Sequence, residues 1–423
     1  MILAHGVGRL YELPIPLYLY LFGATATVVA SFVIRVLAPH VPAARAERLV
    51  AGERAARFVR ALLGSVAMIG FVLTLVVGVV ARDEGFTLPT LFFWVGFIVG
   101  MTVLSTLLGG AWEAADPWAK LESVYRIEAV PTGTGADPWW VAPVGLYALF
   151  WFELVSGVGF QDFFVVMALI AYSLFAFTVR SAAGEGWRLA DPLSVLFGFA
   201  ARLAPLRLGK DGIYAVNPID SLDDPALMPP ALYLSVFVLL GATTMDNVSE
   251  TVGWTVFLDS TGLGALSPLL VESVALAAFG LVFYLPFIAA VGVTGGRGTV
   301  ARRFGWTLIP IAIAYVLAHN VSLILTGVPV MIRSLSDPLG RGWNLLGTAH
   351  LFERYLASPA LVWFAEIVLV VGGHILGVLG AHRVAVRLAG DHRVAVRSQY
   401  SLTVLMSVYT VLTLWLLSQP VVQ

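Results

Sequence analysis

The chain has 423 residues, of which 59% are hydrophobic and only 12% are charged, and its formal net charge is −1. A soluble domain carries roughly 25% charged residues, so this composition excludes the soluble class, and the balanced charge gives no basis for nucleic-acid binding. The chain contains no cysteine, which excludes disulfides, iron–sulfur clusters and thiolate metal ligands.

Ten apolar runs are each long enough to cross a bilayer as a helix, because about 20 residues at 1.5 Å per residue cover a hydrocarbon core of about 30 Å. We therefore expect an all-α integral membrane protein that contacts the lipid bilayer, with about ten transmembrane helices in a single polytopic membrane domain over 1–423. The sixth run is the weakest, since it becomes polar before it is long enough. The runs cover residues 16–37, 61–81, 89–110, 139–158, 163–181, 229–246, 265–292, 305–332, 359–381 and 399–418.

The basic residues predict the orientation of these spans. If the N-terminus lies outside and the connections alternate, 20 of the 25 Lys and Arg residues fall on one side, in the odd-numbered connections. Cytoplasmic connections carry such an excess of positive charge. The sequence thus predicts a multi-pass protein of a prokaryotic cytoplasmic (inner) membrane, with the N-terminus and the C-terminus both outside.

Two polar segments in the odd-numbered connections lack a chemical motif. Residues 39–57 alternate Ala, Arg and Glu, which is typical of a surface helix on anionic headgroups. Residues 206–228 carry Asp220, Asp223 and Asp224, but no defined ligand geometry, so we expect a solvated, polar cytoplasmic loop.

The third and fifth connections repeat each other over 110–131 and 184–205. Asp followed by Pro is typical of a helix N-cap with Pro at the first helical position, so each copy is expected to start a short helix. Either the copies are interfacial helices anchored by Trp, or they form a duplicated gate or a docking surface for a protein partner. The matching residues are Trp112, Asp116 and Pro117 in the first copy, and Trp187, Asp191 and Pro192 in the second.

Ionisable side chains inside or at the ends of the spans are the candidates for function, because such groups usually mark ion paths, proton relays or cofactor sites. Counted from the span ends, all of them lie in the outer half or near the middle. This one-sided distribution predicts a polar cavity that opens outward, although each group alone fits a purely structural role equally well. The candidates are Glu153, Asp246, Glu250, Glu272, His319 with its neighbour Asn320, Glu366 and His374.

Two cofactor hypotheses follow from the histidines. A Cu or Zn site formed by His319, Glu366 and His374, with His5 or His350 as additional ligands, has suitable donors but no tight spacing signature. A haem held by His319 and His374 lacks a second supporting pair.

Several stretches give the chain a resemblance to a family of uncharacterised prokaryotic polytopic membrane proteins, some of which are named fenitrothion hydrolase. The resemblance implies hydrolysis of an organophosphate triester, without a catalytic motif to carry it. It also highlights His319, His374 and His382, although Arg383 follows His382 where an Asp is expected. The stretches are LAHGVGRLYELPIPLYLYLFG, GWRLADPLSVLFGFAARLAPL, IPIAIAYVLAHNVSLIL, SDPLGRGWNLLGTA, GGHILGVLGAHRVAV and RSQYSLTVLMSVYTVLTLWLLSQ.

Three functional hypotheses remain open. The first is transport of a small solute or ion, with Glu272, His319, Glu366 and His374 in binding or proton coupling. The second is a membrane-embedded, metal-dependent enzyme, either hydrolytic or redox, that uses the same side chains. The third is a structural subunit of a larger membrane complex, which docks a partner through the Trp112 and Trp187 helices.

Overall fold

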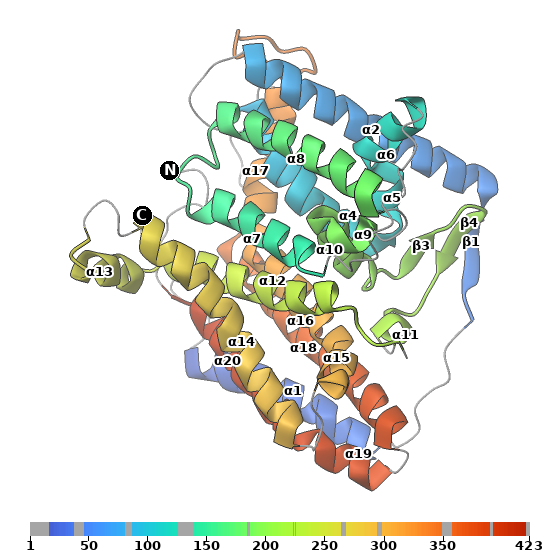
Figure 1. Ribbon diagram of the computed structural model, residues 1–423, viewed down its shortest axis with the longest axis vertical. Helices are drawn as coiled ribbons and strands as arrows, with labels where there is room; N and C mark the ends of the chain where they lie inside the picture. The colour runs from blue at the N-terminus through green and yellow to red at the C-terminus, as the bar shows by residue number, and fades with distance from the viewer. Residues whose placement is uncertain are drawn as a thin grey trace.

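Helices make up most of this protein, and a small sheet lies to one side of them (Figure 1). The computed structural model describes residues 17–37, 46–80, 87–125, 139–183, 187–222, 224, 226–263, 268–293, 298–348, 358–389 and 392–419. The helices of the first half are α1 (Leu17–Leu37), α2 (Glu53–Val80), α3 (Leu88–Leu91), η1 (Phe92–Val99), α4 (Gly100–Leu107), α5 (Ala111–Ala115), α6 (Pro117–Tyr125), α7 (Val141–Leu154), α8 (Asp162–Ala183), α9 (Trp187–Ala190), α10 (Pro192–Ala201) and α11 (Pro218–Leu222). Those of the second half are α12 (Pro230–Ser249), α13 (Val252–Ser260), η3 (Pro268–Glu272), α14 (Ser273–Val293), α15 (Thr299–Gly305), η4 (Trp306–Leu308), α16 (Ile309–His319), α17 (Val321–Ser336), α18 (Pro359–Ala389), α19 (His392–Ser398) and α20 (Tyr400–Leu417).

Eight helical segments of the described chain are long and apolar enough to cross a membrane. An all-α membrane protein is thereby confirmed. The remaining two of the ten predicted spans coincide with α1 and α7, and a total of ten crossings stays a prediction. The eight segments are Glu53–Val80, Leu88–Leu107, Asp162–Ser181, Pro230–Ser249, Leu269–Val293, Thr299–His319, Ala360–Ala389 and Arg393–Leu417.

Helix α2 shows how these segments meet the bilayer. Its large apolar side chains at Val66, Ile69, Val72 and Val76 are between 47% and 60% exposed. In water such a continuous apolar stripe would be an unfavourable surface, whereas hydrocarbon accepts it at no cost. The exposed face of α2 therefore indicates contact with lipid.

The predicted span over 305–332 is not one continuous helix. Helix α16 ends at His319, and α17 begins at Val321, with Asn320 between them at φ −89° and ψ 6°. The Asn320 side chain donates its amide N–H to the carbonyl oxygen of Val316 at 2.9 Å. This local bond competes with the regular helical pattern, which explains why the helix breaks at an Asn.

The sheet has four short strands in the order β1-β4-β3-β2: β1 (Arg48–Gly52), β4 (Gly212–Ala215), β3 (Leu206–Leu208) and β2 (Leu108–Gly109). Strand β4 is antiparallel to β1 and β3, and β2 is parallel to β3. The predicted surface helix over 39–57 is thus wrong for residues 48–52, and the loop predicted at 206–228 contains two strands and α11. The β1–β4 and β2–β3 pairings join segments that are remote in sequence and leave no local pattern, whereas β3 and β4 form a local hairpin. Residues 39–45 and Asp223 lie outside the described residues.

The odd-numbered connections meet at one end of the helices. The sheet joins the first, third and fifth connections through β1, β2 and the β3–β4 hairpin. The seventh joins them where the Arg302 guanidinium donates to the carbonyl oxygen of Met228 at 2.7 Å, and where Trp306, just after it, stacks under the Arg202 guanidinium at 3.7 Å. The ninth joins them where Arg383 pairs with Asp220 at 2.5 Å. If successive spans cross the membrane in opposite directions, all odd-numbered connections must lie on the same side. Their meeting at one end of the helices therefore supports the predicted alternation.

The two repeats each form a short helix, an Asp and a second helix that starts with Pro. Asp116 accepts backbone N–H bonds from Trp118 and Ala119 at 3.0 and 3.1 Å, and Asp191 accepts one from Leu193 at 3.2 Å. The predicted N-caps are therefore confirmed. Residues 126–131 and 184–186 of the repeats lie outside the described part of the chain.

Large parts of the repeat helices are buried against the rest of the protein, and their placement at the membrane surface stays a prediction. Trp112 and Trp118 are 4% and 0% exposed, and Pro117 and Pro192 are buried. The indole N–H of Trp112 donates to the Ser194 hydroxyl at 2.9 Å, which satisfies it without a headgroup.

Arg180 of α8 connects the two repeats. Its guanidinium pairs with Asp116 of the first repeat and with Glu122 at 3.2 Å, and it stacks on Trp187 of the second repeat at 3.8 Å. The side chains of Arg180 and Asp116 are 4% and 3% exposed. Removing one partner of a buried pair leaves the other charge uncompensated.

We expect Arg180→Met to lower the free energy of unfolding in detergent by about 3–5 kcal/mol, because Asp116 stays buried without its counter-charge. A denaturant titration followed by circular dichroism measures the change.

The matched control is Arg188→Met. Arg188 pairs with Glu113 at 3.6 Å, but the two side chains are 58% and 46% exposed. Water screens such a pair, so this variant should lose about 1 kcal/mol or less. Equal losses in the two variants would contradict the role given to Arg180.

Candidate functional site

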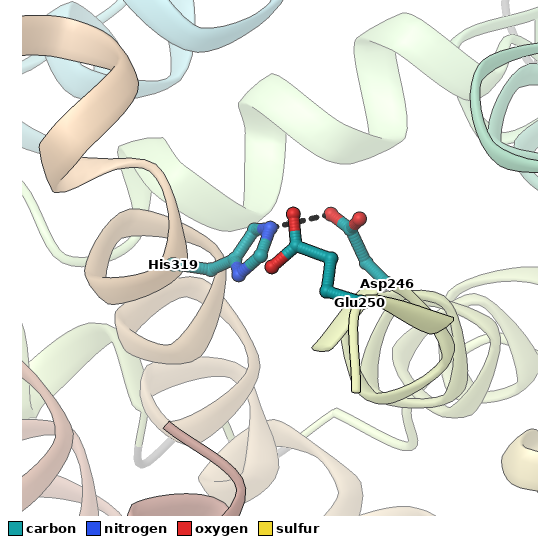
Figure 2. Close-up of side chains that lie close together, drawn as sticks. All are labelled: Asp246, Glu250 and His319. Carbon is teal, nitrogen blue, oxygen red and sulfur yellow. Dashed lines mark ion pairs between the residues drawn. The ribbon is translucent and has the colours of Figure 1, made fainter. Parts of the chain in front are cut away.

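An ion pair between His319 and Asp246 joins the ends of two helices. The Nε2 atom of His319 lies 2.6 Å from a carboxylate oxygen of Asp246, and the side chains are 9% and 12% exposed. Figure 2 shows the imidazole reaching from the end of α16 toward the last turn of α12. Because the carbonyl ends of both helices meet here, their dipoles also favour positive charge at this point.

Glu250 completes a group of three. It follows Asp246 by four residues and caps the C-terminus of α12 in right-handed helical conformation, so both carboxylates project from one face of that helix. One donor atom from each of Asp246, Glu250 and His319 lies within 4.8 Å of the other two. Figure 2 shows both carboxylates turned toward the imidazole.

Two more helices bring carboxylates near this group. Glu153, one residue before the end of α7, interacts electrostatically with Asp246 and with His319. Glu366, in the second turn of α18, interacts electrostatically with His319. Both are partly exposed, so protein does not fully enclose these two side chains.

Close helix packing fixes the positions of α12 and α16. A Cβ atom at Gly241 of α12 would lie 2.4 Å from the backbone nitrogen of Gly280 in α14. A Cβ atom at Gly373 of α18 would lie 2.7 Å from the carbonyl oxygen of Pro310 in α16. Small residues permit such approach between membrane helices, and the tight contacts restrict movement of the helix ends that carry the site.

Three predicted site residues have other partners. Glu272 accepts the indole N–H of Trp254 in α13 at 3.0 Å. The His374 ring, 1% exposed, has its Nδ1 atom 2.8 Å from the carbonyl oxygen of Val370. Asn320 bonds to its own helix and contributes the break next to His319.

The predicted metal set of His319, Glu366 and His374 is not the one that the structure assembles. Within the described residues, the donor atoms that gather closely enough for one ion come from Asp246, Glu250 and His319. Asp246 and Glu250 were among the candidate residues of the expected outward cavity but not in the expected metal set. Their spacing of four on one helix was the available signal.

The other histidines lie elsewhere. His382 is buried, with its Nδ1 atom 3.3 Å from the side-chain nitrogen of Gln399, and the following Arg383 pairs with Asp220. His5 and His350 lie outside the described residues.

We expect His319→Ala and Asp246→Ala each to lower the free energy of unfolding by about 2–4 kcal/mol, because each substitution leaves the other member of the pair partly buried without its counter-charge. In the double variant the loss should be smaller than the sum of the single losses by about 1–3 kcal/mol, which is the range for directly coupled residues. Denaturant titrations of the four proteins give this coupling energy.

His374→Ala combined with Asp246→Ala serves as the control cycle and should be additive within about 0.5 kcal/mol. If the His319 cycle is equally additive, the ion pair does not exist in the folded protein.

No protein-family model, curated protein or solved structure matches this chain. Its resemblance to the membrane proteins named fenitrothion hydrolase therefore stays an expectation from the sequence. What the protein does has to be argued from the site formed by Asp246, Glu250 and His319 and from its place in the helices.

Proposed function

We propose that this protein is a multi-pass protein of a prokaryotic cytoplasmic membrane that transports a small solute or ion. Its binding site is the group of Asp246, Glu250 and His319, flanked by Glu153 and Glu366. The observation that carries the proposal is that four separate helices bring ionisable side chains to one partly exposed place.

The energetics of the bilayer support a functional site here. A charged side chain inside a transmembrane helix costs about 2.5–3.5 kcal/mol on insertion scales, so ionisable groups in spans are rare unless they serve a purpose. Helix packing alone needs no charge, and apolar residues would stabilise these contacts as well. Carboxylates and an imidazole gathered from α7, α12, α16 and α18 therefore favour the handling of a charged or protonatable ligand.

The break between α16 and α17 gives independent support. Transporters often place their substrate and ion sites at discontinuous helices, where the ends of helices point at a ligand. Here the last residue of α16 is His319 itself, and α17 starts only two residues later.

The direction of opening follows from chain direction. Helices α12 and α16 both start near the end where the odd-numbered connections gather, and both end at the site. If the basic connections are cytoplasmic, as the positive-inside rule requires, the site belongs to the outer half of the membrane.

Metal-assisted hydrolysis is the second candidate, because carboxylates and an imidazole are also the donors of catalytic metal sites. The family resemblance would direct it toward an organophosphate triester. A role as a docking subunit has less support, since Trp112 is 4% exposed and Trp187 is covered by Arg180.

Reconstituted protein should carry protons or divalent cations across liposomes loaded with a pH-sensitive or metal-sensitive dye. His319→Ala should reduce the flux to that of empty liposomes, because the group loses its imidazole. His374→Phe, which leaves the group intact, should keep the flux of the unaltered protein. A protein with no flux, but with hydrolysis of a phosphotriester that depends on His319, would establish the second candidate instead.

The absence of native cysteine permits a direct test of orientation. Asp259→Cys in α13 and Lys210→Cys between β3 and β4 replace exposed side chains at opposite ends of the helices. In spheroplasts, an impermeant maleimide should label the first variant at once and the second only after lysis. The reverse pattern would contradict the proposed orientation.

A further inference from the structure

We propose that Asp246, Glu250 and His319 form a binding site for a first-row divalent transition metal ion such as Zn²⁺. This inference rests on the proposed function, because it names the class of ligand that the proposed transport site binds. Binding itself, however, is measurable without transport.

The spacing of the donors suits one ion. Asp246 and Glu250 lie four residues apart, so their carboxylates stand one above the other on one face of α12. This i, i+4 arrangement is the same that places two ligands of one zinc ion on a helix in H-E-x-x-H sites. His319 approaches that face from a second helix, so that binding would link α12 to α16.

The donor chemistry selects the class of ion. The group offers one imidazole nitrogen and two carboxylates. Ca²⁺ and Mg²⁺ prefer sites made only of oxygen, whereas Zn²⁺ and its neighbours accept imidazole together with carboxylate. The group itself contains no sulfur donor, which argues against Cu(I), since that ion prefers thiolate and thioether ligands.

The ion pair holds two of the three donors close to the spacing that one ion requires. The donor atoms of His319 and Asp246 are 2.6 Å apart. Two ligands of a tetrahedral zinc ion with bonds of about 2.0–2.1 Å lie about 3.3 Å apart. The pair therefore has to open by less than about 1 Å, which side-chain rotation alone achieves. Insertion of the metal would replace this hydrogen bond with two coordination bonds and release the proton held between the two atoms to water.

The neighbouring groups suit a dication. Asp246 and Glu250 together balance two positive charges, and Glu153 and Glu366 bring two further carboxyl groups near them from α7 and α18. Three protein ligands leave a fourth position for water or for a further carboxylate, which is the pattern of zinc sites that exchange ligands. A site of this kind can release its ion, as transport requires.

Zn²⁺ binding to the purified full-length protein tests the proposal. After EDTA treatment and desalting, titration with ZnCl₂ should show one saturable equivalent by calorimetry and by elemental analysis, and Zn²⁺ should raise Tm. His319→Ala, Asp246→Asn and Glu250→Gln should each lose this equivalent, while His374→Phe and Glu272→Gln should retain it. Excess MgCl₂ or CaCl₂ should not displace the zinc.

Asp246→Asn and Glu250→Gln keep the size of the side chain, so a loss of zinc binding in them is not expected to result from misfolding. Circular dichroism and gel filtration check that each variant is folded. The proposal is overturned if the unaltered protein takes up less than about a tenth of an equivalent of Zn²⁺ in this titration, well below the occupancy of a folded zinc site. Unchanged binding in folded Glu250→Gln and His319→Ala proteins would overturn it as well. One equivalent of zinc without any flux would uphold the metal site and contradict transport, whereas flux without zinc would contradict the metal site alone.

Discussion

The contact between His319 and Asp246 is the interaction on which the site depends. It joins the end of α16 to the last turn of α12 at 2.6 Å. Both side chains are largely buried, at 9% and 12% exposed, so each would lack compensation if its partner were lost. Glu250, Glu153 and Glu366 then lie around a fixed point, and the close approaches at Gly241 and Gly373 keep the supporting helices together.

The opposite end of the protein is organised by a different constraint. There the connections form a small four-stranded sheet and two repeats, each with a helix that begins at an Asp-Pro pair. Arg180 contacts both repeats, through Asp116 in the first and Trp187 in the second. Indole and hydroxyl groups satisfy one another in this region, as between Trp112 and Ser194. Such bonds suit a rigid base, whereas the broken helix and partly exposed carboxylates at the other end suit a place where a ligand enters and leaves.

The sequence was sufficient for features that depend on local pattern. Apolar length predicted the helices, and Asp followed by Pro predicted the N-caps at Asp116 and Asp191, because both signals lie within one or two turns. It was insufficient where partners are remote. The pairing of β1 with β4, the burial of Trp112 and the meeting of Asp246 with His319 depend on how helices pack, which no local period records. The estimated depths placed the ionisable groups in the outer half or near the middle of the membrane, but they did not indicate which of these side chains would be in contact.

The central claim is that Asp246, Glu250 and His319 share one place at the ends of α12 and α16. An experimental density map of the full chain in a lipid nanodisc tests it most directly. The account predicts that the imidazole of His319 lies within hydrogen-bond distance of the Asp246 carboxylate, or that both contact a common ion. An imidazole directed at lipid, or separated from both carboxylates by another helix, would contradict the account.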